Sequence, residues 1–117
     1  MNIYEKLKMK RQRINKMGKK GIILGQDKNY KGKLPTKELK SAINKLKEQY
    51  QERDESINII GFEINGGTGL TKTGYEEIKK FQEWAKNKGM DAEYNSKFDL
   101  DKMTQILRNR VDNKNKN

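Results

Sequence analysis

The feature that most constrains the fold is an apolar stripe in the segment 36–53. Its members recur at intervals of three and four residues, which is the spacing of one face of an α-helix; they are Leu39, Ala42, Ile43, Leu46 and Tyr50. Pro35 suits the start of this helix, because the first turn does not use the amide hydrogen that proline lacks. A helix with one apolar face must pack against another element. The chain is therefore expected to form a packed domain around this segment.

Other segments carry helix or strand patterns on both sides of this stripe. Helical spacing occurs at 2–17, at 73–89 and at 99–111. Strands are predicted at 21–25 and 57–64, with a weaker pattern at 90–94. We therefore expect an α+β fold of about four helices and a small sheet, in a single domain of residues 1–111. Residues 112–117 (Asp-Asn-Lys-Asn-Lys-Asn) have nothing to bury and are expected to be a disordered tail.

Local signals mark the ends of several elements. Thr73 and Glu76 have the spacing of a capping box, and Asp99 is a suitable N-cap for the last helix. The pair Asn65-Gly66 predicts a β-hairpin with a type I′ turn, which needs positive φ at both central residues. The glycine-rich stretch 66–73 does not fit a phosphate-binding P-loop, because the lysine does not follow the last glycine directly. A hairpin tip followed by a capped helix accounts for it.

Positive charge is concentrated in the first two fifths of the chain. The net charge is +11; residues 1–47 contain 15 lysines and arginines against three acidic residues (+12), whereas residues 48–117 contain 12 against 13 (−1). A lysine-rich composition alone would spread the charge evenly. Segregated positive charge is typical of proteins that bind a polyanion. We expect nucleic acid as the partner, DNA rather than RNA, with an acidic protein or solubility alone as the alternatives.

The candidate nucleic-acid-binding residues fall in three parts of the basic half. On the helix at 36–53, three lysines and an amide share one face without an acidic residue, which suits phosphate contacts and the reading of a base edge. The loop at 26–33 surrounds an aromatic ring with lysines, and the ring is expected either to stack on an unpaired base or to close the edge of the core. The full set is Lys8, Arg11, Arg13, Lys19, Lys20, Tyr30, Lys31, Lys33, Lys37, Lys40, Asn44 and Lys47. The alternative for each charged residue is a solvated surface position.

The predicted order is a helix, a short strand, a lysine-bearing helix, a β-hairpin with a glycine tip and a further helix. The chain enters that further helix through residues 69–78 (Gly-Leu-Thr-Lys-Thr-Gly-Tyr-Glu-Glu-Ile). This order and this stretch resemble winged-helix DNA-binding proteins, in many of which Leu-Thr-x-x-Gly passes from the wing into a dimerisation helix. The resemblance covers about residues 36–85. It implies that residues 36–47 form the recognition helix and residues 65–69 the wing.

Several function classes find no support in the sequence. The chain has no cysteine and no histidine, which removes thiolate metal sites and histidine-based catalysis. The acidic cluster Asp91, Glu93, Asp99 and Asp101 lacks the spacing of a calcium loop and is expected to supply caps and surface charges. We therefore expect no enzyme, no metal and no cofactor; the alternative that the composition leaves open is a metal-dependent nuclease built from acidic residues and a lysine. No apolar stretch is long enough to span a membrane, and we expect a cytoplasmic protein.

Four further expectations concern biological role and assembly. The composition is typical of an accessory or regulatory protein of a phage or plasmid, and the near-neutral second half is a candidate homodimer surface. The rival interpretation is a phage-encoded inhibitor, similar in role to anti-CRISPR proteins, that binds a host protein–nucleic-acid complex. A third interpretation, RNA binding, depends on Tyr30 alone.

Overall fold

The computed structural model describes residues 12–99. Its elements follow one another as β1 (Arg13–Ile14), β2 (Lys20–Asp27), α2 (Thr36–Gln51), β3 (Ile59–Asn65), α3 (Lys72–Lys86) and β4 (Asp91–Asn95). A helical turn starts at Lys97. The predicted binding residues Lys8 and Arg11, most of the predicted first helix, the last helix beyond 99 and the predicted tail lie outside the described residues.

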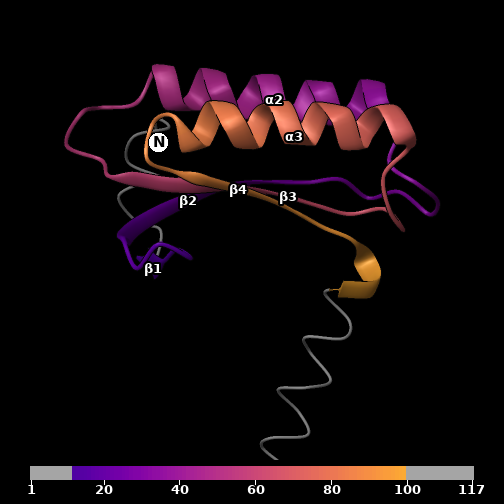
Figure 1. Ribbon diagram of the computed structural model, residues 1–117, viewed down its shortest axis with the longest axis horizontal. Coiled ribbons are helices and arrows are strands. Elements are labelled where there is room, and N and C mark those ends of the chain that lie inside the picture. Colours follow the sequence, from indigo (N-terminus) through magenta and orange to yellow (C-terminus); the bar gives the residue numbers. More distant parts are fainter. Residues whose placement is uncertain (1–11, 100–117) are drawn as a thin grey trace, which may run out of the picture.

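The strands form one mixed sheet with the order β1-β2-β3-β4. β1 runs antiparallel to β2, whereas β2, β3 and β4 are parallel to one another. α2 connects β2 to β3, and α3 connects β3 to β4. Figure 1 shows both helices on the same face of the sheet. The α+β class and the strands near 21–25, 57–64 and 90–94 are therefore confirmed.

The core lies between the two helices and the sheet. α2 contributes the predicted apolar stripe, of which Leu39, Ala42 and Leu46 are fully buried. At the centre of the core, Phe62 of β3 lies against three aromatic rings from α2 and α3. These are Tyr50, Phe81 and Trp84, at centroid distances of 5.9, 5.2 and 5.6 Å. Burying these large apolar side chains is the dominant stabilising contribution, and it fixes α2 beside α3.

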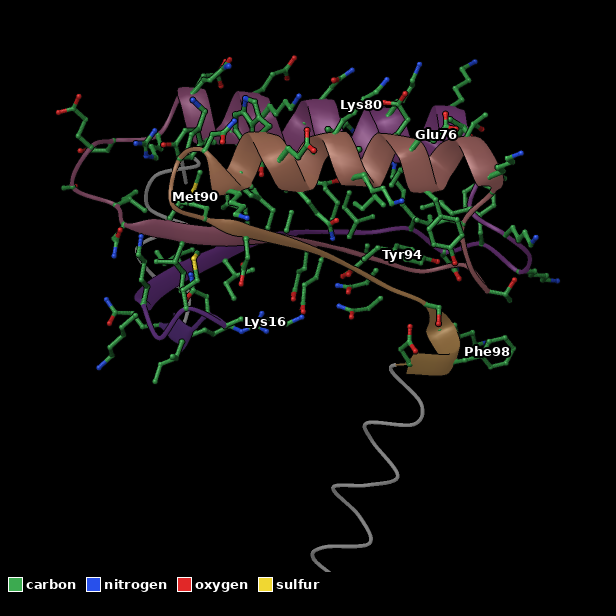
Figure 2. The ribbon with its side chains drawn as sticks, viewed as in Figure 1. Lys16, Glu76, Lys80, Met90, Tyr94 and Phe98 are labelled. Carbon is green, nitrogen blue, oxygen red and sulfur yellow. The ribbon has the colours of Figure 1, made fainter. Side chains whose placement is uncertain are left out.

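The opposite face of the sheet is polar. Arg13 of β1 pairs with Glu63 of β3 at 3.1 Å. Lys16, in the turn after β1, pairs with Glu93 of β4, and this hydrogen bond and charge raise the pKa of the Lys16 ammonium. Figure 2 shows Lys16 on the side away from the helices. Ion pairs from β1 and from the turn after it thus link the first strand of the sheet to β3 and β4.

The predicted hairpin at Asn65-Gly66 is wrong. β3 ends at Asn65, pairs in parallel on both sides, and leads through a loop into α3 rather than into a return strand. The glycines do adopt positive φ, 129° at Gly66 and 74° at Gly67. Glycine here lets the loop after β3 approach the loop after β2 closely, because a Cβ at Gly66 would overlap the carbonyl oxygen of Lys28. The winged-helix arrangement, which needs that hairpin, is not confirmed.

Three element ends also differ from the prediction. Residues 13–14 form a strand and 16–17 a turn, so the first helix does not reach residue 17. The N-cap of α3 is Thr71, whose hydroxyl accepts from the Gly74 amide at 3.0 Å, and not Thr73. The final helical turn is capped by Ser96, whose hydroxyl accepts from the Asp99 amide at 3.2 Å, while the Asp99 carboxylate accepts from Ser96 N at 3.0 Å. Asp99 therefore occupies the third helical position rather than the cap.

Candidate nucleic-acid interface

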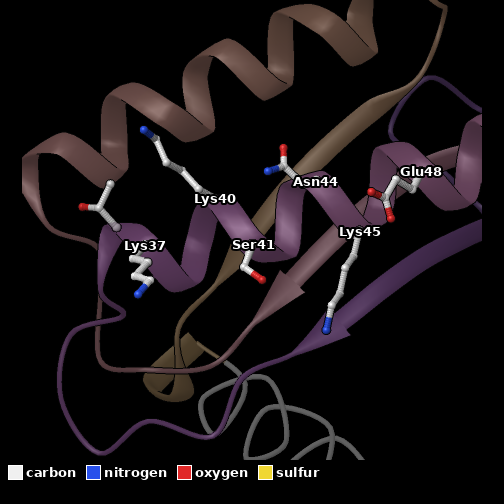
Figure 3. Close-up of a pocket in the computed structure, with 7 residues that line it drawn as sticks. Lys37, Lys40, Ser41, Asn44, Lys45 and Glu48 are labelled. Atoms are coloured by element: carbon white, nitrogen blue, oxygen red, sulfur yellow. The ribbon is translucent and has the colours of Figure 1, made fainter.

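The outer side of α2 carries the predicted face of lysines and an amide. α2 has its apolar stripe against the sheet, so positions 37, 40 and 44 are left exposed. Figure 3 shows Lys40 and Asn44 projecting toward α3, and Ser41 and Lys45 projecting to the other side of the helix. A shallow depression of about 650 Å³ follows this side of α2, lined by Thr36, Lys37, Lys40, Ser41, Asn44, Lys45 and Glu48. The helical spacing therefore brings Lys37, Lys40 and Asn44 of the predicted face to one depression, which Lys47 does not line.

A second depression separates α2 from α3. It has a volume of about 330 Å³ and is lined by Lys40, Asn44 and Lys47 from α2, by Glu77 and Lys80 from α3, and by Ile43 and Phe81 at its base. We call this feature the interhelical groove. Three of its seven lining residues are cationic and only Glu77 is acidic, so the groove carries net positive charge.

The lysine ammonium groups of the groove make only weak contacts with other groups of the protein. Lys40 Nζ lies 4.0 Å and Lys80 Nζ 3.7 Å from Glu77 Oε1, with side chains 58% and 74% exposed. Exposed ion pairs of this kind contribute about 0–1 kcal/mol. Lys47 Nζ instead lies 5.2 Å from the centre of the Trp84 ring, which Lys88 also approaches at 5.2 Å. A phosphate that bound in the groove would therefore replace only weak contacts of these lysines.

The other predicted residues lie in two separate places. Arg13 and Lys19 are exposed, and their cations already have partners in the protein: Glu63 at 3.1 Å and the Gly89 carbonyl at 2.9 Å. Together with Lys20, the first residue of β2, they sit at the amino end of the sheet and away from the outer side of α2. The loop residues Tyr30, Lys31 and Lys33 lie at the opposite end, directly before α2, and are exposed. The predicted residues thus form two separate groups. One is the face of α2 with the loop before it, and the other is Arg13, Lys19 and Lys20 at the far end of the sheet.

Sequence reasoning missed two lysines that belong with this surface. Lys45 lines the depression along α2, and Lys80 reaches the interhelical groove from α3. Lys45 was recognisable from the helical spacing alone. Lys80 was not, because its place beside Lys40 depends on how α3 packs against α2.

Comparison with protein-family models, with curated proteins and with solved structures found no significant match. Among residues 12–99 there is no group of three or more His, Cys, Asp or Glu that could hold a metal ion. Within the same residues, neither helix combines the length and the apolar character needed to cross a bilayer. The candidate interface is therefore argued from its own residues.

Proposed function

We propose that this protein binds nucleic acid, duplex DNA in the first place, through the outer side of α2 and the interhelical groove. The observation that carries the proposal is the convergence of Lys37, Lys40 and Lys47 with Lys80 around a single amide, Asn44. Lysines at these spacings suit the phosphates of one strand, and the amide suits a base edge. The role that fits such a small basic protein is that of an accessory or regulatory factor.

The geometry supports contact by a helix rather than by a wing. α2 is 16 residues long, about 24 Å at 1.5 Å per residue, and its residues 37, 40, 44, 45 and 48 are exposed. The major groove of DNA is about 12 Å wide and admits one helix. Because α3 lies beside α2, we expect the helix pair to meet the phosphates along the rim, with the Asn44 side of α2 nearest the bases.

Charge reversal on α2 tests this proposal. The variant Lys37→Glu, Lys40→Glu, Lys47→Glu should lose binding to a fluorescent 20-base-pair duplex in an anisotropy titration. A matched control reverses Lys72, Lys79 and Lys86, which are exposed on α3 outside the groove, and should retain most of the affinity. Exposed substitutions usually change stability by about 0.5 kcal/mol or less, so both variants should unfold near the wild-type temperature. Equal losses in the two variants would overturn the proposal.

A further inference from the structure

A further pocket lies at the carboxyl end of the parallel strands. It has a volume of about 310 Å³ and is formed by the ends of β2 and β3, the loop that follows β2, and Lys97 after β4. Ligands of sheets with parallel strands bind at this end of the strands, and small-molecule pockets begin at about 300 Å³. We infer that this carboxyl-end pocket binds one unpaired nucleotide, with the base stacked on Tyr30 and the base edge held by Asp27 and Asn65.

The last residues of the three parallel strands form a row of linked polar side chains. Asp27, Asn65 and Asn95 are paired in register across β2, β3 and β4. Asn65 Nδ2 donates to Asp27 Oδ1 at 3.0 Å, and Asn95 Nδ2 donates to Asn65 Oδ1 at 3.0 Å. The chain of bonds fixes the orientation of the Asn65 amide, so that its nitrogen lies beside the carboxylate.

This row leaves hydrogen-bonding groups available at the pocket. Within residues 12–99, the second oxygen of Asp27 and the second amide hydrogen of Asn65 have no protein partner. A carboxylate acceptor beside an amide donor matches the adjacent donor and acceptor on the Watson–Crick edge of a base. That edge is occupied in a duplex. The pocket therefore selects unpaired nucleotides.

The wall of the pocket is an aromatic ring held in place by α2. Tyr30 is 36% exposed. Burial of its hydroxyl is the largest cause that raises the Tyr30 pKa, and the charge of Glu38 and a hydrogen bond with it raise the pKa further. Glu38 also accepts from Lys28 Nζ at 3.5 Å. Lys28 and Tyr30 of the loop thus both lie near the Glu38 carboxylate of α2.

The floor of the pocket is rigid and its rim is cationic. The Lys28 amide donates to the Asn65 carbonyl at 2.7 Å, and the Tyr94 hydroxyl donates to the Gly66 carbonyl at 2.6 Å. The Lys97 amide donates to the Gly67 carbonyl at 2.8 Å, which places the exposed Lys97 side chain at the rim. Figure 2 shows Tyr94 at this end of the sheet, just before the turn that carries Phe98. An ammonium at the rim suits the phosphate of a nucleotide whose base lies inside.

Binding of a single strand to the full chain tests the inference. We expect a fluorescent 12-nucleotide single strand, (dC)12, to bind, and Tyr30→Ala to weaken it about tenfold, the loss typical of one stacking partner. Tyr30→Phe retains the ring and should retain the affinity. Asp27→Ala, which removes the acceptor, should weaken binding severalfold. Tyr75→Ala is the matched control, because Tyr75 is a more exposed tyrosine (54%) that does not line the pocket.

An NMR titration of the ¹⁵N-labelled chain locates the site and separates two sources of the same chemistry. Shifts at residues 27–30 and 66–67 on addition of CMP assign the pocket to free nucleotides; shifts there only with (dC)12 assign it to a nucleotide within a strand. Both outcomes support the inference. Absence of shifts with either probe, or equal losses in Tyr30→Ala and Tyr75→Ala, would overturn it. The inference does not depend on the duplex interface, whose failure appears instead in the α2 charge-reversal variant.

Discussion

In the proposed duplex interface, Asn44 is the residue that we expect to separate sequence-specific from general binding. Its amide lies among Lys37, Lys40 and Lys47. The amide has both a hydrogen-bond donor and an acceptor, in the arrangement that pairs with an adenine edge. A bidentate contact of that kind contributes about 1–3 kcal/mol of discrimination. Lysines on phosphates carry no such information. Asn44→Ala should therefore weaken a selected preferred site about tenfold and leave random duplex unchanged.

A competition titration with both duplexes measures this difference directly. Lys45→Ala is the control, since it lies on the same helix and removes a phosphate contact without a base contact; it should weaken both duplexes equally. If Asn44→Ala also weakens both equally, or neither, then α2 does not read base edges.

The Tyr30 phenol reports on the contact between the loop at 28–34 and α2. Its pKa lies above the ordinary value of 10.0, through burial and then through Glu38. The neutral phenol is favoured in the folded state, so this contact stabilises the fold below pH 10 and is lost as the pH rises through the Tyr30 pKa. Glu38→Gln removes the carboxylate charge and should lower the Tyr30 pKa toward 10.0.

This shift can be followed by NMR in a chain with ¹³C-labelled tyrosine. Tyr94 serves as the internal reference, because its pKa is raised mainly by burial and Glu38→Gln should leave it unchanged. An unaltered Tyr30 pKa in the variant would mean that Glu38 does not hold the ring.

At the scale of elements, the start of α3 depends on Thr71. Its hydroxyl accepts from the Gly74 amide at 3.0 Å and lies 2.6 Å from the Thr36 hydroxyl at the start of α2. Loss of an N-cap side chain costs about 1 kcal/mol. Thr71→Ala should lower the free energy of unfolding by about that amount. Thr73→Ala should cost less, because Thr73 is exposed and its hydroxyl, 2.6 Å from that of Thr36, bonds to no backbone amide at the helix start.

Urea unfolding followed by the fluorescence of Trp84 measures both variants, since Trp84 is the single tryptophan and lies in the aromatic core. A larger loss in Thr73→Ala than in Thr71→Ala would restore the capping box that the sequence suggested.

The elements themselves were largely predictable from the sequence, but their arrangement was not. The period of the apolar residues identified α2, α3, β2, β3 and a weak β4 within a few positions. Strand, helix, strand, helix and strand in alternation favour a parallel sheet, and the four consecutive buried residues 59–62 mark β3 as a central strand. The Asn65-Gly66 pair led instead to the prediction of a hairpin, because glycines with positive φ occur both in hairpin turns and in loops between a strand and a helix.

The candidate site was predictable only where local spacing defines it. Lys37, Lys40 and Asn44 share a face because α2 is a helix, so three- and four-residue intervals sufficed. Arg13 and Lys19 could not be excluded, because their partners Glu63 and Gly89 are 50 and 70 residues away in the chain. The carboxyl-end pocket had no sequence signal beyond Tyr30, since Asp27, Asn65 and Asn95 meet only through the register of parallel strands.

At the scale of the whole molecule, charge and topology divide the surface. The two helices present lysines on one side of the sheet, and the other side carries the ion pairs of Arg13 and Lys16 with Glu63 and Glu93. We propose two ligand classes for this arrangement: duplex phosphates along α2 and an unpaired nucleotide at the carboxyl end of the strands. The homodimer and the inhibitor of a host complex stay predictions of the sequence.

The salt dependence of duplex affinity tests the central claim most directly. Each phosphate neutralised contributes about −0.9 to the slope of log affinity against log salt, and about five lysines along α2 and the groove give a slope near −4.5. Replacing Lys37, Lys40 and Lys47 by Gln should flatten it to about −2, whereas the same change at Lys72, Lys79 and Lys86 should leave it near −4.5. A slope near zero in the wild-type protein, or one that the α2 variant does not change, would contradict binding of DNA through this face.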